Sequence, residues 1–205
     1  MADARRELLV LAAGPGGCAA VDLASGALVR AHYPARTQPD LVPYDVLAAQ
    51  PGGDDTAAFA PDSLVLATVP ERVGHLRGRA VERWLRPLVY PPTEPLLGFS
   101  APSVPFWALA DDRPSLALVA PSAGPVVERG RAGLRCRFRW RRFDHDLPLH
   151  DPRLVAAVTH PAAASMTGGT LARALGWAPH RLLVALTPPR DGVCHKVVAA
   201  ILPRP

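Results

Sequence analysis

The sequence is poor in cysteine. Cys18, Cys136 and Cys194 are the three cysteines among 205 residues, and each lies in an apolar stretch far from the others. An odd number of widely spaced cysteines suits neither a disulfide framework nor a zinc site made of CxxC pairs. We therefore expect buried, reduced thiols in a cytoplasmic protein, and no bound metal.

Long apolar runs are also missing. A helix that crosses a bilayer needs about 18–20 consecutive apolar residues, and no segment of the chain approaches that length. The short apolar run that starts near residue 7 ends at Gly-Pro-Gly-Gly, residues 14–17, which is not the form of a signal peptide. We expect no membrane segment and a cytoplasmic location.

Stretches free of proline and glycine are short. The 24 prolines and 16 glycines interrupt helices and central strands, which excludes a long helical bundle. Hydrophobic residues nevertheless make up 49% of the chain and charged residues 20%, which is enough apolar surface for a globular core. A length of 205 residues leaves one large or two small domains open.

Catalytic motifs are lacking too. The glycine-rich residues 14–17 are followed neither by GK[ST] nor by a helix that could hold phosphate. Residues 165–170 lack the G-x-S-x-G frame of a nucleophile elbow. Cys194 and His195 are neighbours in a predicted strand and so point to opposite faces. We expect neither an enzyme nor a cofactor.

One short segment brings carboxylates and imidazoles together. Asp144, His145 and Asp146 are followed by His150 and Asp151, and such groups can bind a divalent cation. In a strand, however, His145 points away from both neighbouring aspartates. We favour a hairpin whose acids neutralise nearby arginines over a metal site.

Arginine, by contrast, is abundant. Lys196 is the one lysine among 23 basic residues, and the formal net charge is +5. A basic surface raises the local concentration of nucleic acid or acidic lipid, so the charge suggests an anionic partner. A GC-rich coding sequence would give the same excess of arginine, alanine and proline without functional meaning.

The apolar pattern of the first half predicts hairpins and one helix. Strands are expected at residues 7–11, 18–21, 27–33, 44–47 and 63–69, with a sharp turn at 22–26. Apolar residues at spacings of three and four predict an amphipathic helix over residues 73–88. A proline-rich stretch at 91–105 then predicts a linker.

The second half repeats this content. Strands are expected at residues 115–120, 134–141, 143–147, 182–187 and 193–202, with a short helix at 165–175. Without parallel crossovers, such content favours two small closed or partly open barrels over a doubly wound sheet. The predicted fold is thus mainly β with a few short helices, in an N-terminal domain (1–100) and a C-terminal domain (101–205) with one helix each.

Arginines alternate with apolar residues along the predicted strand 134–141. Arg135, Arg137, Arg139 and Arg141 share one face, and Leu134, Cys136, Phe138 and Trp140 share the other. Arg142 extends the row, which could pair with successive phosphates and stack on bases. The alternative is an ordinary solvated outer face of an antiparallel sheet.

Three phrases together resemble the bacterial dual OB-containing domain family: CAAVDLASGALVR at residues 18–30, FDHDLPLHDP at 143–152 and CHKVVAAIL at 194–202. The match spans nearly the whole chain. It implies two OB-like β-barrels packed in tandem, recognition of nucleic acid or nucleotides, and a link to bacterial defence. It also implies Arg30 and Lys196 as ligand-facing positions, although members place proline after this arginine and here Ala31 and His32 follow.

Two functions remain open. The first is a non-catalytic module that binds nucleic acid or a nucleotide through Arg135, Arg137, Arg139, Arg141 and Arg142, with Arg30 and Lys196 as further candidates. The alternative is a protein-protein interaction or scaffold subunit, on which aromatic residues such as Phe106 and Trp107 contact a partner.

Overall fold

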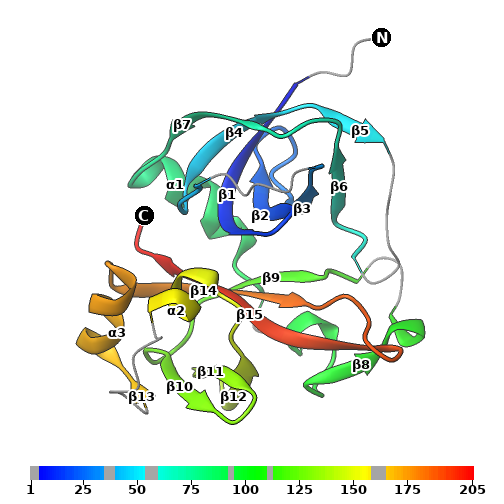
Figure 1. The fold of residues 1–205 in the computed structure, drawn as a ribbon. Helices are drawn as coiled ribbons and strands as arrows, with labels where there is room; N and C mark the ends of the chain where they lie inside the picture. The colour runs from blue at the N-terminus through cyan, green and yellow to red at the C-terminus, as the bar shows by residue number, and fades with distance from the viewer. Residues whose placement is uncertain (1–4, 35–39, 54–59, 92–94, 110–112, 158–164) are drawn as a thin grey trace.

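The chain folds into three curled sheets with a few short helices around them (Figure 1). The computed structural model describes residues 5–34, 40–53, 60–91, 95–109, 113–157 and 165–205. The architecture is mainly β and consistent with two OB-like barrels in tandem, which confirms the predicted fold class. In the described ranges, no helix is long and apolar enough to cross a membrane.

The first barrel closes through one nearly continuous stretch of chain. Its strands are β1 (Arg6–Gly14), β2 (Gly17–Asp22), β3 (Leu28–His32), β4 (Asp45–Ala49), β5 (Pro51–Gly53), β6 (Ser63–Leu66) and β7 (Glu71–His75). They lie in the order β5-β6-β3-β2-β1-β4-β7, with β3 parallel to β6. Because only Gln50 separates β4 from β5, this stretch pairs with β1 at one end and with β6 at the other.

The second barrel follows the same plan with its strands in two sheets. Its strands are β8 (Ser103–Pro105), β9 (Leu116–Val119), β10 (Val126–Gly130), β11 (Gly133–Trp140), β12 (Phe143–Pro148), β13 (Ser165–Met166), β14 (Pro179–Leu186) and β15 (Val193–Pro203). The orders are β12-β11-β10-β13 and β8-β15-β14-β9. A parallel bridge between Leu149 and Val198 joins the end of β12 to β15, as the parallel pair of β3 and β6 does in the first barrel.

Helices are short and lie at the periphery. They are α1 (Arg79–Leu85), α2 (Pro152–Ala157) and α3 (Gly168–Leu175), with the 3-10 turns η1 (Arg86–Leu88), η2 (Leu96–Gly98) and η3 (Phe106–Ala108). A capping box formed by Thr167 and Thr170 begins α3, and Gly176 ends it at φ 81°. The predicted helix at 165–175 is confirmed from residue 168 onward, and α2 is an additional helix.

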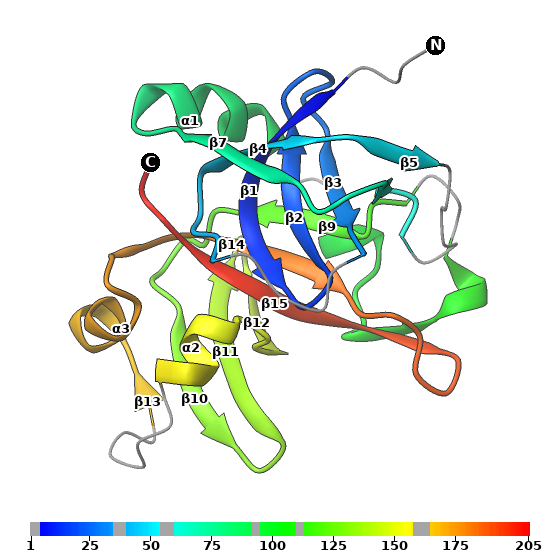
Figure 2. The same ribbon diagram turned by 45° about the horizontal axis from the view of Figure 1, so that its top comes forward.

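Strand alternation creates a core inside each barrel and an apolar layer between them. On β1, Leu8 belongs to the core of the first barrel, whereas Leu9 faces outward. On β14, Leu182 belongs to the core of the second barrel, and Leu183 faces outward into the same layer as Leu9. Figure 2 shows β1 and β2 lying across β9, β14 and β15. Both faces of these strands are therefore buried, which explains their continuous apolar sequences.

The predicted helix over residues 73–88 is wrong in its first part. Residues 71–75 form β7, and α1 begins only at Arg79. The cause is Asp45, which is fully buried on β4 and lies 3.0 Å from both Arg72 Nη2 and His75 Nδ1. These contacts hold β7 against β4, a pairing that the helical spacing of apolar residues could not reveal.

The proline-rich stretch also differs from the predicted linker. In its described part, η2 and β8 are ordered elements, and Leu96 and Leu97 are 2% and 0% exposed in the core of the second barrel. Val104 on β8 pairs with Cys194 on β15. This segment therefore packs as part of the second barrel.

Candidate nucleic-acid interface

The arginine row lies on the outer face of β11. Cys136, Phe138 and Trp140 are 0%, 4% and 4% exposed in the core, whereas Arg137 and Arg139 are exposed on the opposite face. β10 and β12 pair with β11 on either side. The predicted alternation along this strand is confirmed, including the placement of Trp140 in the core.

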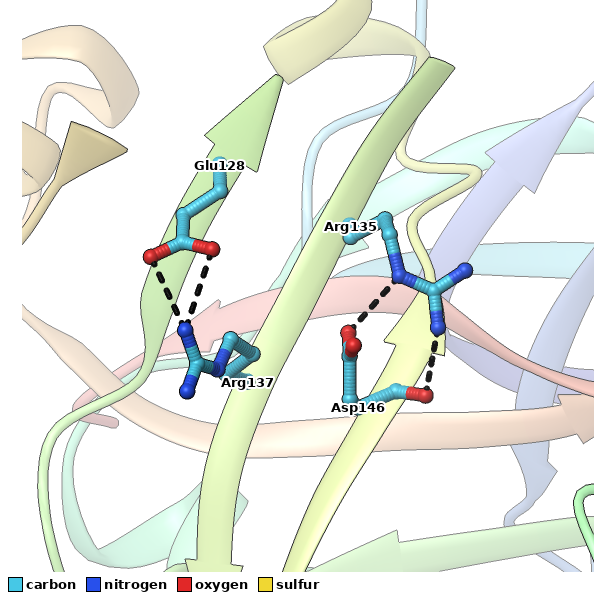
Figure 3. A network of polar contacts seen from close by, with 4 residues as sticks. All are labelled: Glu128, Arg135, Arg137 and Asp146. Atoms are coloured by element: carbon cyan, nitrogen blue, oxygen red, sulfur yellow. Dashed lines mark hydrogen bonds and ion pairs between the residues drawn. The ribbon is translucent and has the colours of Figure 1, made fainter. Parts of the chain in front are cut away.

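Two of these arginines form ion pairs with acids on the neighbouring strands (Figure 3). Arg135 donates from Nε to Asp146 Oδ1 and from Nη2 to the Asp146 backbone oxygen, both at 2.8 Å. Arg137 Nη1 lies 3.3 and 3.2 Å from the two carboxylate oxygens of Glu128. In the sheet register Glu128 is opposite Arg135 and Asp146 is opposite Arg137, so both pairs run diagonally across the strands.

The remaining arginines of the row have different surroundings. Arg139 lies opposite Asp144, but it forms no ion pair with any residue that the structure describes. Arg141 adopts φ 62° at the β11–β12 turn, and its guanidinium lies 5.0 Å from the centre of the Trp140 ring. Arg142 is exposed in the same turn, next to Phe143, which is 64% exposed.

The three-stranded unit β10–β12 carries most of the net positive charge of the chain. Residues 126–148 contain seven arginines and three carboxylates, an excess of four positive charges, whereas the whole chain has a formal net charge of +5. The ion pairs of Arg135 and Arg137 neutralise part of the strand face. The excess positive charge therefore lies at Arg139 and at the two turns that flank β11, where Arg131 and Arg142 are exposed.

Arg30 lies elsewhere, between the barrels. It donates from Nε to Ser115 Oγ at 2.6 Å and from Nη2 to the backbone oxygens of Ser115 and Leu186 at 2.9 and 2.7 Å. Burial lowers the pKa of Arg30, while Asp62 acts in the opposite direction. Its guanidinium thus connects β3 of the first barrel to Ser115, directly before β9, and to the end of β14 in the second barrel. The ligand contact that the family resemblance implied for Arg30 stays a prediction.

Lys196 is also buried, in the interior of the second barrel. The residue is 2% exposed, its ammonium donates to the Phe99 backbone oxygen, and Nζ lies 4.0 Å from the centre of the Phe99 ring. Burial lowers its pKa to about 8. Because these contacts satisfy Lys196 inside the second barrel, it does not join the arginines on the outer face of β11.

A cleft lies between the barrels, and Arg30, one of the predicted ligand-facing residues, is among the residues that line it. Its volume is about 370 Å³, and its lining includes the glycine-rich turn after β1 together with His32 and His150. These two histidines come from different barrels and lie far apart in the sequence, so no local motif could have joined them. Most of the lining is alanine, glycine and proline.

The described residues offer little for metal or thiol chemistry. They contain no group of three or more histidines, cysteines or acids that could hold a metal ion. All three cysteines are buried, as predicted, and burial raises the pKa of Cys18 and of Cys136 to about 12. These thiols are therefore poor nucleophiles at neutral pH.

Comparison with family models, with curated proteins and with solved structures gave no match to this chain. Its function therefore has to be inferred from the geometry and charge of its own sites.

Proposed function

We propose that this protein is a non-catalytic module that binds single-stranded nucleic acid across the outer face of β11 and β12. The observation that carries the proposal is the exposure of Arg137 and Arg139 on one face of β11, within a unit that holds four of the five excess positive charges. Residues two apart in a strand are separated by about 7 Å, a spacing that suits successive phosphates of an extended single strand.

An exposed aromatic ring favours a single strand over a duplex. Phe143 follows the arginines of the β11–β12 turn and is 64% exposed. It lies opposite Trp140, so a strand bound to Arg137 and Arg139 would reach this ring by passing round the turn. Unpaired bases can stack on such a ring, and each stacked base contributes about 1–3 kcal/mol. In a duplex the faces of the bases are covered by their neighbours, so this contact would be lost.

The position of the arginines within the barrel is a further support, by analogy of fold. OB-folds bind oligonucleotides on the face of their second and third strands and on the loops beside them. In the second barrel β11 and β12 take these places, and the loop between β14 and β15 carries the exposed Arg190. We place the protein in the cytoplasm, where such ligands and reduced thiols both occur.

The proposal is tested by fluorescence anisotropy with a labelled single-stranded oligonucleotide at low salt. We expect affinity to fall steeply with salt, because phosphate binding releases counterions. The double variant Arg137→Ala/Arg139→Ala should lose about tenfold or more in affinity, and its salt slope should decrease by about two.

A matched control comes from the first barrel. Arg77 and Arg79 have the same spacing and are exposed, so Arg77→Ala/Arg79→Ala removes the same charge from a different surface. This variant should bind almost as well as the wild type. Absence of binding at low salt, or an equal loss in the two double variants, would refute the proposal.

A second candidate function is docking of a protein partner at η3. Phe106 and Trp107 are 39% and 69% exposed and pack edge to face, with ring centres 5.4 Å apart. Exposed aromatic pairs of this kind are typical of protein interfaces. One stoichiometric protein partner, lost with Trp107→Ser and free of nucleic-acid absorbance, would favour this function over the first.

A further inference from the structure

We infer that Asp146 and Glu128 compete with nucleic acid for Arg135 and Arg137, so that these two carboxylates regulate the affinity of the proposed site. The inference rests on the proposed function. It concerns what happens to the ion pairs of the free protein when a phosphate reaches the strand face. The pairs in Figure 3 then act as an internal inhibitor.

Both ion pairs are exposed enough to be exchanged. The side chains of Arg135 and Asp146 are 41% and 51% exposed, and those of Arg137 and Glu128 are 59% and 35% exposed. Ion pairs at this level of exposure are weak, because water and salt screen them. A phosphate oxygen forms charge-assisted bonds to guanidinium of at least equal strength and can therefore displace the carboxylate.

The geometry of Arg135 keeps its guanidinium in place during this exchange. Nη2 donates to the backbone oxygen of Asp146 at 2.8 Å, independently of the bond from Nε to the carboxylate. The backbone bond does not depend on the Asp146 side chain. Removing the carboxylate charge therefore frees Nε for a ligand without releasing the whole side chain.

A neighbouring residue provides a matched control. Asp144 is exposed on β12 and shares an outward direction with Asp146. It lies opposite Arg139 but forms no ion pair with an arginine in the part of the chain that the structure describes. Asp146→Asn and Asp144→Asn thus remove the same charge from the same surface, and only the first releases an arginine.

The experiment compares the oligonucleotide affinity and salt slope of the wild type with those of three single variants. Asp146→Asn should bind about fivefold more tightly, as the loss of a favourable exposed ion pair allows, with a salt slope steeper by about one. The affinity of Glu128→Gln should increase by about two- to threefold, because the Glu128–Arg137 contacts are longer than the Asp146–Arg135 contact. The affinity of Asp144→Asn should increase by less than about twofold, because the loss of this charge acts only through the screened electrostatic field. Its salt slope should be unchanged.

Each other result has a definite meaning. Equal gains for Asp146→Asn and Asp144→Asn would overturn the inference, since net charge alone would explain them. Weaker binding by Asp146→Asn would also overturn it, because the carboxylate would then be positioning the arginine for its ligand. Failure of all four proteins to bind would instead refute the proposed function. Thermal unfolding of each variant serves as the check on folding.

Discussion

Lys196 shows how a charged side chain can be used inside this protein. It is almost fully buried, and its ammonium contacts the Phe99 carbonyl and the Phe99 ring. No carboxylate forms an ion pair with it in the described residues. Burial of the unpaired charge is the reason that its pKa falls to about 8.

The variant Lys196→Met should raise the free energy of unfolding by about 1–2 kcal/mol near pH 7, because it removes a buried charge but keeps a long apolar side chain. The pKa of this lysine rises from about 8 in the folded state to its ordinary 10.5 on unfolding. Between these values the unfolded chain binds more protons than the folded chain, so the free energy of unfolding of the wild type rises with pH. The advantage of the variant therefore becomes smaller as pH rises. Urea denaturation near pH 7 and pH 10 measures the difference, and an advantage independent of pH would contradict the prediction.

Gly17 is required by a close approach of two strands. A Cβ atom at this position would lie 2.6 Å from the backbone oxygen of Ala31 on β3. We expect Gly17→Ala to cost about 2–3 kcal/mol of stability, because the backbone has to move. A Cβ atom at Gly14, in the same hairpin, would meet no other atom within 4 Å, so Gly14→Ala should change stability by less than about 0.5 kcal/mol. Urea denaturation compares the two, and equal effects would disprove the steric explanation.

At the scale of elements, β7 depends on one buried carboxylate. Asp45 accepts a bond from Val42 N at 3.0 Å and lies 3.0 Å from both Arg72 Nη2 and His75 Nδ1. Asp45→Asn removes the charge that these groups share. It should cost about 2–3 kcal/mol of stability, and amide hydrogen exchange in residues 71–75 should become faster.

The control for this prediction lies on β7 itself. Glu71 pairs with Arg5 at 2.6 Å, but both side chains are largely exposed, so Glu71→Gln should change stability by less than about 0.5 kcal/mol. Faster exchange of β7 in Glu71→Gln than in Asp45→Asn would show that surface charge, and not the buried carboxylate, holds the strand.

Local patterns predicted the elements whose contacts are local. The alternation at residues 134–141 placed Phe138 and Trp140 in the core and Arg137 and Arg139 outside, because side-chain direction in a strand depends only on position. The end of the predicted helix at residue 175 agrees with α3, because the glycine that follows it can adopt the positive φ that ends a helix. The start of α1 was not, because the pairing that makes residues 71–75 a strand comes from Asp45, far away in the sequence.

The candidate site was predictable to the same extent. Sequence located the arginines and their common face, and it suggested that nearby acids neutralise some of them. It could not say which, because the diagonal pairs of Arg135 with Asp146 and of Arg137 with Glu128 follow from the register of three strands. Arg30 and Lys196 were assigned to a ligand by resemblance alone, and their buried contacts are long-range.

At the scale of the whole molecule, polar contacts fix the two barrels relative to each other. Arg30 reaches Ser115 and Leu186, and the Tyr44 hydroxyl donates to the Pro203 backbone oxygen at 2.7 Å. Arg181 forms two bonds with Glu82, at 2.9 and 2.7 Å. These contacts surround the apolar layer, so we expect the barrels to unfold together.

The variant Arg30→Met tests this coupling. This variant leaves the backbone oxygens of Ser115 and Leu186 without their hydrogen-bond donor. The free energy of unfolding should therefore fall by about 2–4 kcal/mol. In the wild type, tryptophan fluorescence and far-UV circular dichroism should report one coincident urea transition. Arg139→Met, on the open face of β11, should leave the midpoint unchanged. Two separate transitions in the wild type would contradict the coupling.

The apolar layer between the barrels has a consequence for any shortened form of the chain. Leu9, Leu11, Leu118 and Leu183 are each 0% exposed in this layer, although they point away from the interior of their own barrel. Each half expressed alone would expose these leucines to water and would aggregate through them. The two halves therefore depend on each other for solubility, and co-expressed fragments should be recovered as a complex while either fragment alone precipitates.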